Sequence, residues 1–225
     1  MGEYDIGYPH ASTPRIVPNG YRTITNRMIA FRLDREYYDG DRANGYGGFR
    51  YDGRWRQIIP DIIERYQLTS RSKVLDIGCK KGFFLHDLKK MLPGVQAKGV
   101  ENHPYPFEQA MATVKNDLIL APYQNLPFND HEFDFVMAFA SIYMLNLRDV
   151  MGCLREIQRV GKGHSYITLG AYRTDEERRL FLDWTLLGTT VLHVDEWLAV
   201  FKETGYTGDY FFTTASSLHL VSPQT

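Results

Sequence analysis

The sequence predicts an α/β fold with a doubly wound, mostly parallel sheet, on two observations. From Lys73 onward, short apolar runs alternate with amphipathic runs of helical period. Strands that alternate with helices in this way form a mostly parallel sheet that is covered on both faces. The last two apolar runs, near 208–213 and 217–221, have no helical run between them. We therefore expect these two runs to form a C-terminal antiparallel β-hairpin.

The first part of the chain is predicted to be less regular. Residues 1–20 contain three prolines among scattered polar residues, which is typical of an irregular arm. A helix is expected over 24–38, and the stretch 39–54 that follows is too rich in glycine for a regular element. A second helix is expected over 55–66, kinked or restarted at Pro60.

Local signals support several of the later elements. Pro104 suits the first turn of a helix, Thr174-Asp-Glu-Glu177 is a capping-box pattern, and Asp195 and Gly205 begin and end the last helix. The expected strands are 73–77, 96–101, 117–120, 134–139, 164–170, 208–213 and 217–221. The expected helices of this part are 83–92, 104–114, 147–159, 174–184 and 195–204.

The turn between the first strand and its helix carries the clearest functional signal. The strand ends in Asp76, and the chain then turns through Gly78 and Gly82 into an amphipathic helix. Glycines let the backbone approach a ligand closely, and the helix that follows offers unpaired N–H groups. The next strand ends in a second acid, Glu101, where nucleotide-binding folds place a ribose ligand. The pattern predicts a mononucleotide-type cofactor site.

The bulk composition restricts the possible partners. The 26 basic and 27 acidic residues give a net charge of −1, without the basic face of a nucleic-acid binder. Cys79 and Cys153 lie far apart and form no metal-ligand spacing, and His10 and His131 are assigned no role. No apolar run reaches membrane-spanning length, and the N-terminus lacks the order of a signal peptide. We expect a cytoplasmic protein with neither nucleic acid nor membrane as partner, and the sequence does not indicate its oligomeric state.

Together with the turn, two further segments carry a family resemblance. Residues 125–136 look like a segment that leads into a fourth strand, and residues 196–206 look like a last helix with the turn after it. Over roughly residues 55–222, the chain resembles the class I S-adenosylmethionine-dependent methyltransferases. The resemblance implies a Rossmann-like methyltransferase fold with a seven-stranded sheet, formed by 55–225. Residues 1–54 then form an N-terminal arm and lid, and the expected function is methyl transfer to an O or N atom of a small molecule.

The resemblance also implies which residues hold S-adenosylmethionine. Glu101 would accept hydrogen bonds from both ribose hydroxyls, Asn125 and Leu126 would lie beside the adenine, and Phe139 would close the site. The full set of expected cofactor residues is Asp76, Gly78, Cys79, Lys80, Gly82, Glu101, Asn102, Asn125, Leu126 and Phe139.

Two positions depart from the family pattern. Lys80 replaces the usual middle glycine, and Pro122 replaces an acid that often binds the adenine amino group. Lys80 either pairs with the methionine carboxylate or is a solvated side chain on a tolerant turn. Both departures affect the details of cofactor placement.

Methyl transfer needs a positioned acceptor and leaves a general base optional, so few residues reveal the chemistry. Three residues near the expected carboxyl edge of the sheet are candidates for catalysis. They are Tyr143, His193 and Tyr172. For Tyr143 the alternative is packing under the adjacent helix, and for His193 it is a structural hydrogen bond. Arg173 binds an acidic group of the substrate or pairs with Asp175 or Glu176.

The stretch from Tyr37 to Trp55 interleaves glycines, aromatic rings and arginines. This composition favours a lid that orders over a ligand, as in a bacterial subgroup of the family, against a structural strap or a single-strand nucleic-acid surface. The substrate-binding candidates are Tyr38, Tyr46, Arg50, Arg54 and Arg173.

Other functions stay open. The same fold could cyclise or cleave S-adenosylmethionine, and the departures at Lys80 and Pro122 would also suit a non-catalytic cofactor-binding domain. A nicotinamide dehydrogenase fits worst, because the turn from Gly78 to Gly82 lacks the G-x-G-x-x-G spacing.

Overall fold

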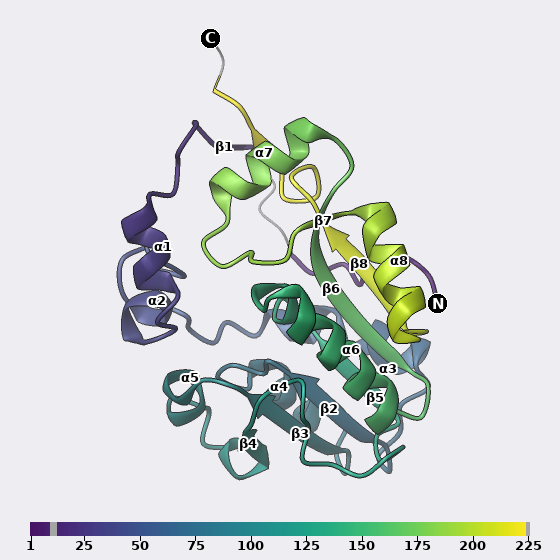
Figure 1. Ribbon diagram of the computed structural model, residues 1–225. Coiled ribbons are helices and arrows are strands. Elements are labelled where there is room, and N and C mark those ends of the chain that lie inside the picture. The colour runs from purple at the N-terminus through teal and green to yellow at the C-terminus, as the bar shows by residue number, and fades with distance from the viewer. Residues whose placement is uncertain (10–12, 224–225) are drawn as a thin grey trace.

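The computed structural model describes residues 1–9 and 13–223, and within them the predicted doubly wound sheet is confirmed (Figure 1). Its seven strands are parallel throughout, in the order β4-β3-β2-β5-β6-β7, with β8 also paired to β6. The chain thus reverses its direction of travel across the sheet between β2 and β5. The strands are β2 (Lys73–Ile77), β3 (Gln96–Glu101), β4 (Leu118–Leu120), β5 (Phe135–Ala138), β6 (Ser165–Tyr172), β7 (Leu192–His193) and β8 (Asp209–Thr213).

The predicted antiparallel hairpin at the C-terminus is wrong. Strand β8 lies parallel to β6, and β9 (Leu220–Val221) pairs instead with β1 (Arg15–Ile16) in a separate two-stranded sheet. The turn after β8 diverts the chain: the amide of Thr214 donates to the Ser217 hydroxyl at 2.9 Å, and the amide of Leu220 donates to the carbonyl of Ala215 at 2.9 Å. The apolar residues after β8 therefore pack against helix α7 and the N-terminal arm.

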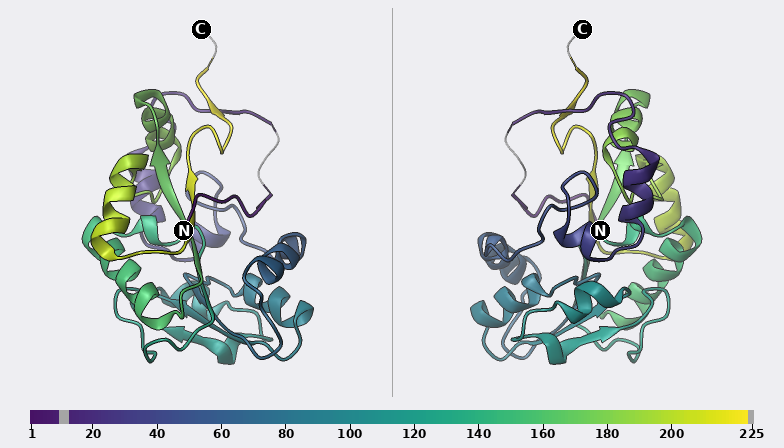
Figure 2. Two further views of the ribbon diagram at one scale, coloured as in Figure 1. Left: turned by 90° about the vertical axis from the view of Figure 1, so that its right-hand side faces the viewer. Right: turned by 90° about the vertical axis from the view of Figure 1, so that its left-hand side faces the viewer.

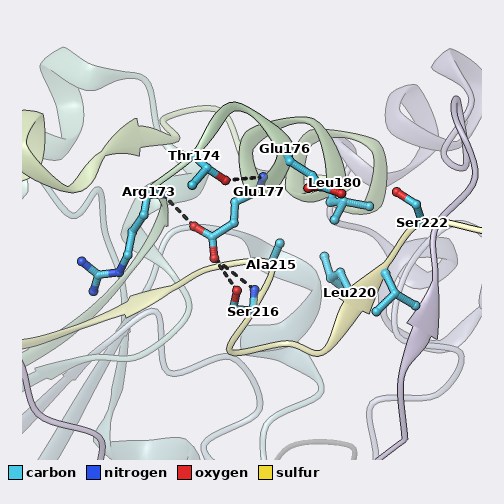
Figure 3. A pocket seen from close by; sticks show the side chains of 10 residues that line it. Arg173, Thr174, Glu176, Glu177, Leu180, Ala215, Ser216, Leu220 and Ser222 are labelled. Atoms are coloured by element: carbon cyan, nitrogen blue, oxygen red, sulfur yellow. Dashed lines mark hydrogen bonds between the residues drawn. The ribbon is translucent and has the colours of Figure 1, made fainter.

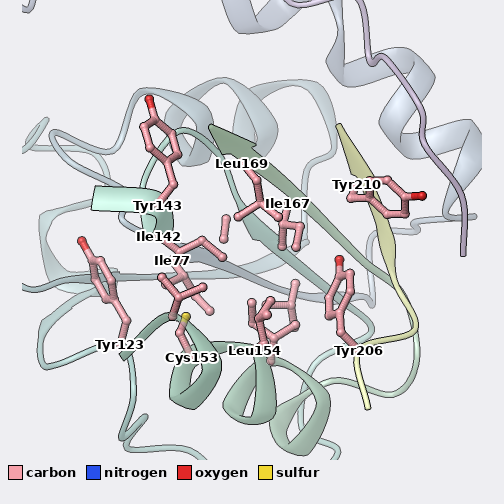
Figure 4. Close-up of a cluster of buried hydrophobic side chains, with 14 of the residues drawn as sticks. Ile77, Tyr123, Ile142, Tyr143, Cys153, Leu154, Ile167, Leu169, Tyr206 and Tyr210 are labelled. Carbon is pink, nitrogen blue, oxygen red and sulfur yellow. The ribbon is translucent and has the colours of Figure 1, made fainter. Parts of the chain in front are cut away.

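Helices cover both faces of the sheet (Figure 2). On one face, α6 (Leu147–Val160) and α8 (Val194–Thr204) bury a large apolar cluster that includes Cys153, Leu154 and Trp197 (Figure 4). On the other face, α3 (Ile59–Arg65) and α4 (Phe83–Met91) bury a second cluster. Helix α7 (Asp175–Trp184) follows β6 and lies beside β9. Its Leu180 and Phe181 belong to a third, smaller apolar cluster with residues of the N-terminal arm and of the chain after β8.

Several helices are shorter than predicted. The expected helix over 24–38 is divided into α1 (Ile24–Ala30) and α2 (Arg35–Asp39), because Leu33 adopts a left-handed φ of 50° before the new N-cap Asp34. Helix α5 (Pro104–Glu108) ends early, since the chain turns so that the amide of Met111 donates to the carbonyl of Lys81 at 3.0 Å. The expected break at Pro60 separates the 3-10 helix η1 (Arg54–Gln57) from α3.

Outside the sheet, α1 and α2 form a small unit beside α5 and α7 (Figure 1). Two further 3-10 helices, η2 (Lys115–Asp117) and η3 (Ile142–Met144), lie in the connections before β4 and after β5. None of the helices formed by residues 1–9 and 13–223 is long and apolar enough to cross a membrane. His10, which was assigned no role, lies outside the described residues.

Candidate functional site

The turn after β2 has a backbone that requires its glycines. Gly78 and Gly82 have φ values of 75° and 78°, in the left-handed region. A Cβ added at Gly78 would lie 2.3 Å from Cβ of Ser141, and one at Gly82 would lie 2.6 Å from Val114. Both glycines are therefore fixed by conformation and by close packing.

A cavity of about 420 Å³ lies against this turn, where the strand order reverses between β2 and β5. Its sheet wall comes from the turn and from the loop after β5, and it includes Asp76, Gly78, Cys79, Lys80, Phe139, Ala140 and Tyr143. Its N-terminal wall consists of residues 46 and 48–55 together with Tyr8, Pro9, Arg15 and Arg42. No group of three or more His, Cys, Asp or Glu side chains suited to a metal is present in residues 1–9 and 13–223.

Lys80 bends back over the turn instead of extending into solvent. Its Nζ donates to three main-chain carbonyls, those of Gly78 at 3.4 Å, Phe139 at 3.2 Å and Ala140 at 3.3 Å. The backbone at Lys80 takes a φ of 54°, in the region that favours glycine. Burial disfavours its charge, but neighbours that include Tyr46, Asp76 and Glu101 raise the pKa of Lys80 above its usual value.

Asp76 is the buried acid of the cavity. Its side chain is 4% exposed, and burial raises its pKa to about 7, although the charge of Lys80 acts in the opposite direction. Burial likewise raises the pKa of the neighbouring Cys79 thiol far above its usual value, so that Cys79 is protonated at neutral pH. Asp76 therefore changes its charge in the physiological range, whereas Cys79 does not.

Glu101 is 2% exposed and is occupied by groups of its own chain. Its carboxylate accepts the amides of Lys80 at 2.9 Å, Asn102 at 2.9 Å and His103 at 3.1 Å. The hydroxyl of Tyr123 donates to it at 3.1 Å. Burial raises the pKa of Glu101, and these donors and Lys80 lower it. In this conformation Glu101 is not among the described residues that line the cavity.

The N-terminal wall is attached to the sheet by a few polar anchors. Asp39, at the end of α2, accepts Nζ of Lys81 at 2.7 Å and the hydroxyl of Tyr105 at 2.8 Å. The hydroxyl of Tyr51 donates at 2.6 Å to Asp87, which is fully buried on α4. These two contacts hold the segment 34–54 over the carboxyl edge of the sheet.

Most of the predicted lid residues lie in this wall. Tyr46, Arg50 and Arg54 line the cavity. Tyr38 is 3% exposed and is not among the described lining residues, because its ring stacks between Tyr46 at 5.8 Å and Tyr105 at 5.9 Å.

The predicted adenine residues are also placed outside the cavity. Leu126 is buried, and its amide donates to Glu156 at 2.7 Å in a network with Arg159. Neither Asn125, beside it, nor Asn102 is among the described lining residues. Tyr123 follows Pro122 in the chain. Its hydroxyl points away from the apolar cluster (Figure 4) and donates to Glu101.

The candidates for catalysis separate in space. Tyr143 lines the cavity and directs its hydroxyl away from the apolar cluster (Figure 4), whereas His193 and Tyr172 are not among the described lining residues. His193 is the N-cap of α8, in the place predicted for Asp195, and its ring accepts the amide of Asp195 at 3.3 Å. Its ring also packs edge-on against Tyr172, with 5.5 Å between centroids.

Arg173 borders a second hollow, of about 450 Å³, between α7 and the chain after β8 (Figure 3). Its guanidinium pairs at 3.0 Å with Glu3 of the N-terminal arm, in place of the acidic neighbours considered from the sequence. Glu177 beneath it accepts the amide of Arg173 at 2.7 Å and the hydroxyl of Ser216 at 2.6 Å (Figure 3). These polar groups satisfy one another, which is typical of a structural junction.

Several residues of the cavity were not among the predicted site residues. Arg42 lies inside the glycine, arginine and aromatic stretch, so its composition was a usable signal. Tyr8, Arg15 and Trp184 come from the irregular arm and the end of α7, where no periodicity or motif marks them.

The fold and the turn define a doubly wound α/β protein with a cavity at the carboxyl edge, at the point where the strand order reverses and where such folds bind their ligands. Residues 75–169, which contain the turn and strands β3 to β5, match the family described as methyltransferase domain. The match confirms the resemblance to the class I S-adenosylmethionine-dependent methyltransferases that was predicted from the turn.

The curated relatives that the chain matches are also methyltransferases. The chain is 26% identical over 161 residues to cycloartenol-C-24-methyltransferase 1 of Oryza sativa, and 26% identical over 149 residues to malonyl-acyl-carrier-protein O-methyltransferase of Legionella pneumophila. Each match covers 64% of this chain, and 44% and 51% of the relatives. The chain thus spans about half the length of the curated relatives it matches.

Solved structures share the fold. The cyclase SpnF superposes with a TM-score of 0.56 at 18% identity, over 87% of this chain and 75% of its own. YcgJ of Bacillus subtilis gives a TM-score of 0.54 at 20% identity, over 65% and 66% of the two chains. Both similarities concern the fold alone.

S-adenosylmethionine is the cofactor of this family, and the chemistry of the site suits it. Glu101 supplies a carboxylate for ribose hydroxyls, and three carbonyls converge where an ammonium can bind. In this structure, however, the chain itself occupies both sets of acceptors. Tyr123 donates to Glu101, and Lys80 donates to the three carbonyls. The donor and acceptor types thus fit the cofactor.

Proposed function

We propose that this chain is an S-adenosylmethionine-dependent methyltransferase whose acceptor is an O or N atom of a small molecule. The observation that supports it best is the glycine turn beside a cavity at the strand-order reversal, within the segment that matches the family. The relatives' names include a C-24-methyltransferase and an O-methyltransferase, so they do not narrow the acceptor atom.

The lining of the cavity favours an acceptor with an acidic group and an apolar body. Arg54 is paired with Asp52, with its Nε 2.8 Å from Oδ2, so its charge is balanced. Arg15, Arg42 and Arg50 line the same cavity, and none of them forms an ion pair with an acid within residues 1–9 and 13–223. Guanidinium groups bind carboxylates and phosphates in a bidentate manner. Rings of the cavity such as Trp55, Tyr46 and Phe139 would contact the apolar part.

Tyr143 is the predicted catalytic residue that this arrangement retains. Burial raises the pKa of its hydroxyl well above the usual value, so the group stays protonated at neutral pH. It can therefore donate a hydrogen bond that orients an acceptor, but it does not serve as a base. We further propose that His193 and Tyr172 take no part in catalysis, since neither is among the described residues that line the cavity.

The experiment is transfer of a labelled methyl group from S-adenosylmethionine to a panel of paired acceptors, each tested as the free acid and as its neutral ester. The proposal expects label to pass to acids and poorly to esters. Equal transfer to both members would contradict the assigned role of the arginines. Formation of methylthioadenosine from the cofactor without any acceptor would instead support cleavage on the same fold.

A further inference from the structure

The ammonium of Lys80 occupies a cage of main-chain carbonyls. The cage is formed by Gly78, after β2, and by Phe139 and Ala140, after β5, at distances of 3.2 to 3.4 Å from Nζ. An ammonium has three N–H donors, and the cage offers three acceptors. The cage lies at the strand-order reversal and borders the cavity. Any primary ammonium that enters from the cavity would meet acceptors that are already in use.

The carboxylate oxygens of Glu101 are likewise occupied by donors of the chain itself. Glu101 receives three backbone amides and the hydroxyl of Tyr123, and it is 2% exposed. One of those amides belongs to Lys80, so a single residue contacts both the cage and the acid. A hydroxyl on Glu101 and an ammonium in the cage are the groups that an adenosyl amino acid would itself provide.

We propose that Lys80 is a built-in competitor for the amino-acid end of the cofactor, and that the ligand's α-ammonium enters the cage only by displacing it. This inference rests on the proposed function. The flexible four-carbon stem lets the ammonium leave while the backbone of the turn stays in place. Displacement breaks the three bonds of Lys80 to the cage, so these bonds oppose binding of the ligand's amino-acid end.

The neighbouring lysine shows that the arrangement is specific to position 80. Lys81 extends to the other side of the turn, where its Nζ pairs with Asp39 at 2.7 Å and donates to the carbonyl of Phe49 at 3.1 Å. Lys81 therefore attaches the N-terminal wall, whereas Lys80 fills the cage. The acids near Lys80 are Asp76 and Glu101, and the phenols near it are Tyr8 and Tyr46. A ligand that displaces Lys80 must replace its charge beside the two acids.

The test compares two nucleosides that differ at the amino-acid end. S-adenosylhomocysteine carries the α-ammonium, and methylthioadenosine lacks it. Calorimetric titrations of both would be made with the full chain as wild type, as Lys80→Met, which keeps a long stem without the charge, and as Lys90→Met. Lys90 is exposed on α4, so its substitution is the matched control.

Lys80→Met is expected to tighten S-adenosylhomocysteine binding by roughly tenfold or more, since charge-assisted bonds no longer have to be exchanged. Methylthioadenosine binding should change by less than about twofold, and Lys90→Met should alter neither. Weaker binding of S-adenosylhomocysteine by Lys80→Met, or an equal change for both nucleosides, would overturn the competition.

Two controls keep the outcomes separate. Thermal unfolding of each variant reports whether the turn still folds, and Lys80→Gly, which suits the φ of 54°, repeats the test on a relaxed backbone. If neither nucleoside binds to wild type or to either Lys80 variant, the proposed function itself fails. If wild type binds both and Lys80→Met behaves like wild type, the competition alone is wrong.

Discussion

The two walls of the cavity are built in different ways. The sheet wall consists of short turns that follow β2 and β5, and its shape is set by tight packing, such as that of Gly78 against Ser141. The N-terminal wall belongs to a glycine-rich segment and is attached through a few polar contacts, chiefly those of Asp39 and Asp87. We therefore expect the N-terminal wall to detach from the sheet more readily than the turns of the sheet wall change their shape.

The sheet wall should be the more sensitive to an added methyl group. Gly78→Ala places a Cβ 2.3 Å from Cβ of Ser141 and forces a φ of 75° on alanine. We expect a loss of about 2–5 kcal/mol in the free energy of unfolding, measured by urea denaturation. Gly205→Ala is the matched control, since its φ is 69° and no atom lies within 4 Å of the added Cβ. An equal loss in both variants would mean that packing at Gly78 is unimportant.

The two walls should also differ in the sign of their pH dependence. Asp76 has a pKa raised to about 7 by burial, so the folded state holds a proton that the unfolded state has released. Its contribution to stability is therefore lost as pH rises from about 4 to 7, by about 2–4 kcal/mol. Asp76→Asn should remove this fall, as measured by urea denaturation across that range. Parallel curves for the two proteins would contradict the raised pKa.

The contribution of Asp39 to stability should change with pH in the opposite direction to that of Asp76. Burial disfavours its charge, but the bonds from Lys81 and Tyr105 dominate and lower its pKa. Its stabilising contribution is present above the unfolded pKa of about 4 and is lost as pH falls through the lower folded value.

Asp39→Asn should loosen the N-terminal wall of the cavity and leave the sheet wall intact. Losing the ion pair with Lys81, whose side chain is 11% exposed, should cost about 1–3 kcal/mol locally. Hydrogen exchange should then rise across residues 34–54 and stay unchanged in β2, β3 and β5. Asp52→Asn, which removes an exposed pair within the same segment, serves as the control. Uniformly faster exchange throughout the sheet would show that the two walls are one unit.

The same contrast explains what the sequence could predict. Alternating apolar runs and the glycine turn predicted the parallel sheet, the edge that carries the cavity and the family resemblance, because strand, turn and helix signals are local. Pairing of β9 with β1 depends on contacts between segments about 200 residues apart, and no local pattern distinguishes it from a hairpin. The side-chain direction of Lys80 and the burial of Glu101 likewise depend on carbonyls and tyrosines supplied by other loops. The sequence left the role of His193 open because a helix cap and a ligand-facing histidine look alike in sequence.

Calorimetric titration of wild type and Glu101→Gln with S-adenosylhomocysteine tests the nucleotide site most directly. We predict one bound nucleoside per wild-type chain, and an affinity about 1–3 kcal/mol weaker in Glu101→Gln, because a charged acceptor of the ribose hydroxyls is lost. Absence of binding to wild type, or the same affinity in both proteins, would contradict a cofactor held between the turn at Gly78 and the acid that ends β3.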